Sequence, residues 1–163
     1  NFTPFVKLLG PQGLNLPMAV LTDYDPQDEG AALGVNRVKS LIRCIDATVE
    51  TDSLDEGELF SCGEVHGIFV SDYTFEISLF TEGRRKVLCN AISELSSNNS
   101  LRTRVSGWKD NPDTLDEEQF LKDVKTISKG RLGQRVASKI VTSENSNCPD
   151  YISRAIDYLI ERI

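Results

Sequence analysis

The sequence predicts an α/β fold: a parallel sheet flanked by helices, with additional helices at the C-terminal end. Two apolar runs, at residues 14–22 and 65–71, end abruptly in acidic and polar residues, as buried strands of a parallel sheet do. A segment whose apolar residues have helical spacing follows each run. Strand–helix–strand–helix order is typical of an α/β layer.

The first run, LNLPMAVLT at 14–22, is entered through a Gly-Pro-Gln-Gly turn, and DYDPQDEG follows it. A helix is expected at 31–45, where apolar residues recur at mostly helical spacing. Residues 46–63 are acidic and poor in apolar side chains, which predicts a surface excursion. The run VHGIFVS at 65–71 is the second expected strand, and 75–95 reads as a helix that ends at the loop Ser-Ser-Asn-Asn-Ser.

The second half is predicted to be helical. After a break at 109–114, Thr114 or Asp116 can cap a helix at 117–127. Residues 130–141 form another candidate helix. Pro149 stands at the first turn of a closing helix whose apolar face is expected to be Ile152, Ala155, Ile156, Leu159 and Ile160.

Bulk properties bound the class of protein. The 163 residues fit one domain, and no apolar run reaches the ~20 residues that cross a bilayer. A net charge of −7 gives no general basic footprint for nucleic acid. It is compatible with metal-assisted phosphodiester chemistry, which needs carboxylates. A cytoplasmic protein without membrane contact is expected. Since the first residue is not Met, we expect a piece of a longer chain.

Several conspicuous residues are better explained by structural roles. The four cysteines are widely spaced, without the close pairs of a zinc site, and are expected to be free thiols. His66 lies inside an apolar strand and is interpreted as a packed or edge histidine rather than a catalytic base. Trp108, among basic residues, could stack on a base, but a half-buried loop anchor is the favoured interpretation.

Oxygen-bearing residues follow both expected strands. Asp23 and Asp25 come after the first, and Ser71, Asp72, Thr74 and Glu76 come after the second. Ligands of parallel α/β sheets bind beyond the carboxyl ends of the strands. In an extended segment, residues two apart project to the same side. Asp23 and Asp25 could therefore share a cation, and so could Thr74 and Glu76. Carboxylates around one point suit a hard ion such as Mg²⁺.

A late basic segment could serve a phosphate. Lys129 and Gly130 stand at a predicted helix start after Ser128, where a lysine can offset charge on a phosphate or a leaving oxygen. Arg131 and Arg135 share a possible face with it. Together they would form a small basic strip, which an acidic phosphodiesterase needs.

These segments resemble the TOPRIM domain of OLD-family (overcoming lysogenization defect), ATP-dependent endonucleases. The matching segments are LTDYDP at 21–26, SDYTFE at 71–76, KGRLGQRVA at 129–137 and CPDYISRAIDYL at 148–159. Their order and spacing span nearly the whole chain. The resemblance implies that residues 1–163 are one partial TOPRIM nuclease domain, the C-terminal part of a chain with an N-terminal ABC-type ATPase.

Carried over residue by residue, the resemblance implies Asp23 and Asp25 as metal ligands, Asp23 also being catalytic, and Thr74 and Glu76 as supporting metal-site residues. Lys129 is implied as the catalytic lysine near the scissile phosphate, and Gly130 as permitting close backbone approach. Arg131 and Arg135 extend this phosphate- and DNA-binding set. The implied cofactor is a pair of Mg²⁺ or Mn²⁺ ions, and ATP acts only through the ATPase domain.

The resemblance further implies DNA as substrate, homo-oligomers and a role in phage defence. One departure stands out. TOPRIM sites also take a glutamate from a strand that precedes the D-x-D motif, which is Asp23 and Asp25 here. The first glutamate in this sequence is Glu29, which follows that motif. The first TOPRIM strand and its ligand are therefore expected to be missing, and we expect this chain alone to bind metal weakly and to cleave DNA poorly or not at all.

Two alternatives remain open from the residues. A haloacid-dehalogenase-type phosphatase would use Asp23 as nucleophile with Ser71 or Thr74 and Lys129. It needs a further acidic pair on a later strand, where the chain offers only Asp150 and Asp157 in a predicted helix. The second alternative is a regulatory or oligomerisation domain that kept the fold after losing the site.

Overall fold

The computed structural model describes residues 2–27, 29–141 and 147–163. The chain divides into two compact units. Unit 1 comprises Asn1–Phe75 and Asp150–Ile163, and unit 2 comprises Glu76–Pro149. None of the described helices combines the length and the apolar character that crossing a lipid bilayer requires.

Unit 1 is built on two parallel strands, β1 (Val20–Thr22) and β2 (Ile68–Val70). Val20 pairs with Ile68 and Thr22 with Val70. Both strands lie within the predicted runs but are shorter. Pro17 interrupts the first run, and residues before Val20 are irregular. Gly67, with φ +78°, turns the chain just before β2. The parallel pairing confirms the predicted α/β class.

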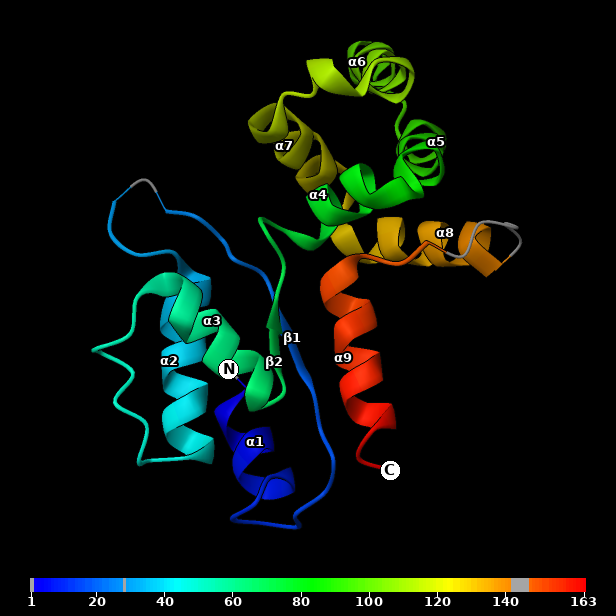
Figure 1. Ribbon diagram of the computed structural model, residues 1–163. Coiled ribbons are helices and arrows are strands. Elements are labelled where there is room, and N and C mark those ends of the chain that lie inside the picture. The colour runs from blue at the N-terminus through cyan, green and yellow to red at the C-terminus, as the bar shows by residue number, and fades with distance from the viewer. Residues whose placement is uncertain (1, 28, 142–146) are drawn as a thin grey trace. The chain divides into compact units, whose positions relative to one another are not determined.

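Helices cover both faces of these strands (Figure 1). The helices α1 (Thr3–Leu9), α2 (Leu33–Ile45) and α3 (Glu56–Val65) form one layer, and α9 (Asp150–Ile160) forms the other. Ile68 is buried in the core cluster with α2 and α3, whereas its neighbour Phe69 packs against Tyr151 and Ala155 of α9. Burial of β2 on both faces explains why its sequence is apolar without alternation.

Two predictions about unit 1 are wrong in detail. Residues 46–63 are not wholly a surface excursion, because α3 begins at Glu56 and its Leu59 is only 1% exposed. Asp55 starts this helix with a reciprocal capping box that includes Glu58. In α9 the buried positions are Tyr151 and Ala155, whereas Ile156 and Ile160, on the predicted apolar face, are 49% and 66% exposed.

Unit 2 is helical in its described residues. It contains most of α4 (Phe75–Leu79), a π-helical turn (Phe80–Arg84), α5 (Arg85–Leu95), α6 (Asn99–Asp110), a 3-10 turn (Pro112–Thr114), α7 (Glu117–Ile127) and α8 (Lys129–Val141). The helix predicted at 75–95 is therefore three pieces, broken where Gly83 takes φ +104°. The helices at 117–127 and 130–141 are confirmed, and Asp116 caps the former by accepting from the Gln119 N–H.

Trp108 lies in α6 rather than in a loop and is only 6% exposed. Its ring makes an edge-to-face contact with Phe120 of α7 at 5.9 Å between centroids, and Phe80 contacts Phe120 at 5.5 Å. These three rings lie in the core of unit 2. A tryptophan packed in this way cannot stack on a base, so that option is excluded.

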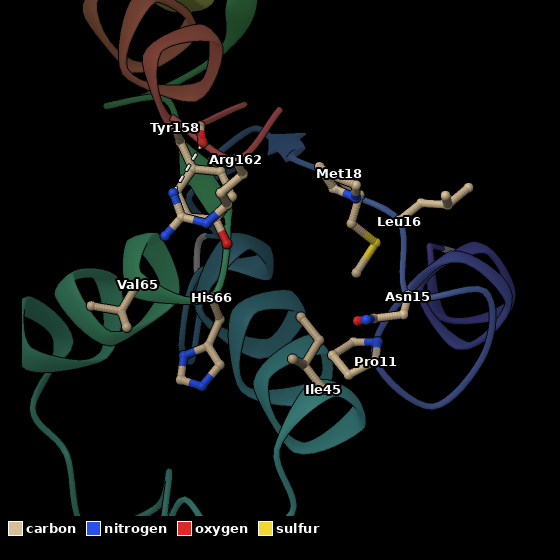
Figure 2. Close-up of a pocket in the computed structure, with 10 residues that line it drawn as sticks. Pro11, Asn15, Leu16, Met18, Ile45, Val65, His66, Tyr158 and Arg162 are labelled. Atoms are coloured by element: carbon tan, nitrogen blue, oxygen red, sulfur yellow. Dashed lines mark hydrogen bonds between the residues drawn. The ribbon is translucent and has the colours of Figure 1, made fainter. Parts of the chain in front are cut away.

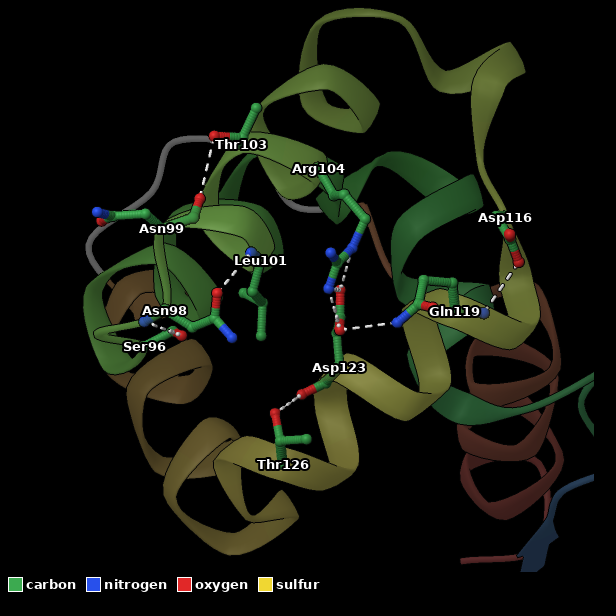
Figure 3. Close-up of polar contacts among 10 residues, drawn as sticks. All are labelled: Ser96, Asn98, Asn99, Leu101, Thr103, Arg104, Asp116, Gln119, Asp123 and Thr126. Atoms are coloured by element: carbon green, nitrogen blue, oxygen red, sulfur yellow. Dashed lines mark hydrogen bonds and ion pairs between the residues drawn. The ribbon is translucent and has the colours of Figure 1, made fainter.

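One buried acid of unit 2 is fully accounted for by internal contacts (Figure 3). The Asp123 carboxylate, 4% exposed, accepts from the Arg104 guanidinium at 2.6, 2.9 and 3.0 Å and from the Gln119 side chain at 3.0 Å. The pair raises the pKa of Arg104, chiefly through this hydrogen bonding. Asp123 therefore joins α6 to α7 and is not a candidate for chemistry.

Candidate metal and phosphate site

The carboxyl ends of β1 and β2 lie side by side because the strands are parallel and in register. Asp23 follows β1 directly, and Ser71, 1% exposed, follows β2 and donates its N–H to the Thr22 carbonyl at 3.0 Å. The sequence prediction that these two strand ends meet is confirmed within unit 1. This edge is where an α/β sheet places ligands.

The Asp23 carboxylate joins the two strand ends. Its Oδ1 accepts from the backbone N–H of Phe75 at 3.0 Å and from the Ser71 hydroxyl at 3.4 Å. Phe75 is the first residue of α4, where an acidic group is favourable for the exposed N–H groups. Asp23 thus has a structural role in addition to any role with a cation.

Asp25 has an unusual backbone conformation. Its backbone is left-handed, with φ +50°, so the segment after β1 turns instead of remaining extended. The predicted extended backbone is therefore wrong at Asp25, whereas the predicted sharing of a cation by Asp23 and Asp25, which line one hollow, stays a prediction. The Asp25 carboxylate contacts the Arg37 guanidinium of α2 at 2.7 Å.

A hollow of about 490 Å³ opens at this end of β1. Its walls include Asp23, Asp25 and Arg37 together with aromatic side chains from Phe75 and Tyr151. The Asp25 and Arg37 side chains remain about a third exposed, at 30% and 36%. Small ions and water can therefore reach the acidic turn from solvent.

Thr74 and Glu76 stand at the start of α4. Because the helix begins at Phe75, Glu76 is in its first turn, and the predicted extended arrangement of Thr74 and Glu76 is wrong. Both residues are buried, at 7% and 8% exposed. Thr74 belongs to unit 1 and Glu76 to unit 2.

Glu76 pairs with the predicted lysine. Its Oε1 lies 2.9 Å from Lys129 Nζ, and the Glu76 side chain is 10% exposed while that of Lys129 is 57% exposed. Among the described residues, no group donates a hydrogen bond to the buried Oε2 of Glu76. Leaving a carboxylate oxygen buried and unsatisfied is costly, so it marks a place for a cation or a donor.

The donor set suits a hard divalent ion, since Asp23, Asp25, Thr74 and Glu76 offer only oxygen. Within 2–27, 29–141 and 147–163, however, no three His, Cys, Asp or Glu side chains form a group that could hold a metal. Asp23 and Asp25 lie in unit 1 and Glu76 in unit 2. The ligand set with all three acids therefore stays a prediction.

The predicted basic strip lies on α8. Arg131 and Arg135 line a shallow hollow of about 360 Å³ with Gln134 and Ser138. Arg135 also contacts Glu94 of α5 at 3.3 Å. A side-chain carbon at Gly130 would meet nothing within 4 Å, so the space before it is open, but nothing within the described structure requires glycine there.

Two members of this surface were not recognised from the sequence. Lys139, one turn beyond Arg135, lies 2.7 Å from Glu94, and hydrogen bonding to Lys139 is the main cause that lowers the pKa of Glu94. Glu94 thus neutralises part of the strip. The i, i+4 spacing from Arg135 to Lys139 was a usable signal, whereas the contact with α5 was not.

Charge is divided unevenly between the two units. The residues of unit 1 include 6 basic and 15 acidic side chains, a net charge of −9, whereas those of unit 2 include 12 basic and 10 acidic ones, a net of +2. The overall acidity of the chain therefore conceals a unit that does not repel a polyanion.

His66 lies away from this site. It ends α3 before β2 rather than lying inside the strand, so it stands at the amino ends of the strands, opposite Asp23. His66 lines a hollow of about 290 Å³ together with Met18, Ile45 and Arg162 (Figure 2). The Arg162 guanidinium stacks 3.4 Å from the centre of the Tyr158 ring. The Nδ1 of His66 is 2.8 Å from the Cys62 carbonyl, consistent with a packed histidine.

Two solved structures of OLD proteins are similar to this chain over nearly its whole length. No protein-family model and no curated protein matches it. The C-terminal region of the Burkholderia pseudomallei OLD protein is similar, with a TM-score of 0.86 and 39% identity over 99% of this chain and 78% of that one. The C-terminal region of the Xanthomonas campestris pv. campestris OLD protein is also similar, with a TM-score of 0.83 and 33% identity over 99% of this chain and 76% of that one.

Proposed function

Because this chain belongs to the OLD family and matches its C-terminal region, we propose that it is a divalent-metal-dependent, DNA-cleaving TOPRIM domain. The observation that best supports this proposal is the Glu76–Lys129 pair. A buried carboxylate with one oxygen lacking a donor, beside a half-exposed ammonium group, is suited to a cation on one side and a phosphate on the other.

Each residue has a definable part in this proposal. Asp23, Asp25 and Glu76 supply carboxylate oxygens for Mg²⁺ or Mn²⁺, with Thr74 in support. When bound, such ions would supply activation of a water molecule and stabilisation of the departing oxygen. Lys129, whose side chain is 57% exposed, offsets charge on the scissile phosphate. Gly130, Arg131 and Arg135 contact the DNA backbone near it.

The proposal extends to the protein around this domain. We propose an ABC-type ATPase domain in the same parent chain, through which ATP acts, together with homo-oligomers in the cytoplasm and a role in phage defence. A second ion in the complete site would need the glutamate that precedes the D-x-D strand in this family. We therefore propose that this chain alone binds metal weakly and cleaves DNA poorly.

Plasmid nicking by the full-length parent protein with Mn²⁺ tests the proposal. Asp25→Asn and Glu76→Gln should each lower nicking by about 100-fold or more, because loss of even an outer partner of a metal ligand typically costs about 10–100-fold. Asp52→Asn is the matched control, because Asp52 is an exposed acid paired with Lys39 and Arg43 of α2. Full nicking by both site variants would overturn the proposal.

A separate measurement tests the requirement for the upstream glutamate. The purified 163-residue chain is incubated with supercoiled plasmid and Mn²⁺ beside the parent protein. Robust nicking by the chain would show that its own carboxylates suffice.

The two alternatives have distinct outcomes. In a haloacid-dehalogenase-type phosphatase a phosphoaspartyl group would be trapped at Asp23, but the required late acidic pair is absent from a strand: Asp150 and Asp157 lie in α9. A regulatory or oligomerisation domain would leave nuclease activity unchanged in the Asp23→Ala parent protein. Loss of activity in that variant supports the nuclease.

A further inference from the structure

We infer that Arg37 is a positioning residue that holds the D-x-D turn and aims the Asp25 carboxylate at a divalent cation; this inference rests on the proposed function. Arg37 lies in α2 (Leu33–Ile45), 12 residues after Asp25, and no motif in the sequence marks it. The inference is carried by the contacts of its side chain.

One guanidinium nitrogen of Arg37 spans the whole turn. Its Nη1 lies 3.2 Å from the Thr22 hydroxyl, 3.2 Å from the Asp23 carbonyl and 2.7 Å from Asp25 Oδ2. The three acceptors come from the last residue of β1 and from both aspartate positions. A surface ion pair would need only the third contact, so this arrangement fixes the path of the chain as well as its charge.

The backbone at the start of α2 holds the same turn. The Gly34 N–H donates to the Tyr24 carbonyl at 2.8 Å, and the Leu33 N–H donates to the Asp25 carbonyl at 3.1 Å. A side-chain carbon at Gly34 would come within 2.8 Å of the Asp23 and Tyr24 carbonyl oxygens. The first turns of α2 therefore pack closely against residues 23–25 and hold the left-handed backbone of Asp25 in place.

Arg37 leaves Asp25 able to bind a cation. It contacts Oδ2, so Oδ1 of the carboxylate remains as an acceptor, and Asp25 lines the hollow at the end of β1. Its positive charge opposes a nearby cation, but both side chains are about a third exposed, and solvent weakens that repulsion. We expect the correct orientation of the Asp25 carboxylate to outweigh this repulsion. Mutation of a residue that hydrogen-bonds to a metal ligand typically changes the metal affinity by about 10–100-fold.

The contact geometry also predicts which substitution is tolerated. All three contacts converge on a single nitrogen, and the ammonium group of lysine is one nitrogen with three donors. Arg37→Lys should therefore retain much of the positioning, whereas Arg37→Met, which keeps a long apolar side chain without a donor, should not.

Binding of Mn²⁺ to the 163-residue chain, followed by the electron paramagnetic resonance signal of the free ion, tests the inference without relying on catalysis. We expect Arg37→Met to weaken Mn²⁺ binding by about tenfold or more and Arg37→Lys by less than about threefold. Arg43→Met is the matched control, because Arg43 lies on the same helix and pairs with the exposed Asp52. Circular dichroism verifies that each variant is folded.

The outcomes separate the inference from the proposed function. Failure of the wild-type chain to bind Mn²⁺ at any concentration would overturn the inference about Arg37, whereas the proposed function is judged separately by plasmid nicking with the parent protein. Wild-type binding that is abolished by Asp25→Asn but unchanged or strengthened in Arg37→Met would overturn only the role of Arg37. Equal losses in Arg37→Met and Arg43→Met would show that the loss does not come from the contacts of Arg37 with the turn after β1, which also overturns the inference.

Discussion

Replacing Asp23 with asparagine and with alanine should separate its structural role from its proposed role with a metal. The contacts of the Asp23 carboxylate include a hydrogen bond from the Phe75 N–H at 3.0 Å and a longer contact from the Ser71 hydroxyl at 3.4 Å. Hydrogen bonds to charged groups contribute about 1.5–3 kcal/mol. Because Asp23 is half-buried and its second contact is weak, Asp23→Ala should lower the free energy of unfolding of unit 1 by about 1–2 kcal/mol.

Asp23→Asn should behave differently. The amide oxygen still accepts from the Phe75 N–H, so the loss of stability should stay below about 1 kcal/mol. Its neutral amide is a poor ligand for a hard cation, so Mn²⁺ binding should be lost in both variants. Only the alanine variant should therefore lose both stability and metal binding.

Urea unfolding followed by circular dichroism gives the stability, and the Mn²⁺ titration gives binding. With a slope of about 1–3 kcal/mol per molar urea, the alanine variant should unfold about 0.5–1 M earlier. An unchanged urea midpoint for Asp23→Ala would refute the claim that the Asp23 carboxylate stabilises the junction of the two strand ends. Wild-type Mn²⁺ affinity in Asp23→Asn would refute Asp23 as a ligand.

Three further predictions concern other regions. Phe120→Leu should destabilise unit 2 by about 2–3 kcal/mol, since it removes two ring contacts and some volume; Trp108, the single tryptophan, reports this in fluorescence-monitored urea unfolding, and an unchanged midpoint would contradict the packing. Maleimide at neutral pH should label the exposed Cys148 first and Cys89 last, because burial raises the pKa of Cys89 to about 12; early labelling of Cys89 in native protein would contradict this. Glu94→Gln should tighten DNA binding by about two- to fivefold in low-salt fluorescence anisotropy, because it removes one negative charge beside Arg135 and Lys139, and weaker binding would count against this surface.

The pH dependence of the Glu94 contacts has a definite sign. Its pKa is lowered in the folded chain, first by the hydrogen bond from Lys139. The stabilisation is therefore fully present above the pKa of an unfolded glutamate and is lost as pH falls through the lowered value. The Glu94→Gln variant should lack this part of the acid sensitivity in unfolding measurements at a series of acidic pH values.

The strand ends could be predicted because local sequence determined them. An apolar run followed by acids and a turn identifies the carboxyl end of a buried strand without knowledge of its partner. The same reasoning correctly gave α7 and its Asp116 cap. It failed for α3, whose capping box lies in an acidic stretch that contains few apolar residues. For α9 it correctly predicted that Ala155 is buried, but it missed Tyr151 and placed the exposed Ile156 and Ile160 on the buried face.

The contacts that define the site could not be predicted in this way. Asp25 has a left-handed backbone and its side chain contacts Arg37. Both features depend on how α2 packs against the residues after β1, and no spacing in the sequence predicts that packing. The pairing of Glu76 with Lys129, 53 positions apart in the sequence, likewise depends on the packing of unit 2. The lysine and the acid were recognised as residue types, but their contact is a tertiary property.

The unequal charge of the two units has a consequence for how the proposed activity should respond to magnesium. A phosphate polymer is repelled by a body carrying nine excess negative charges, and that repulsion weakens as divalent ions accumulate around the acids. Magnesium would thus have two effects. It would bind at the proposed site, and it would screen the negative charge of unit 1 so that DNA is repelled less. The activity curve would then rise more steeply with magnesium than ligand occupancy does, and extra monovalent salt at fixed magnesium would flatten it.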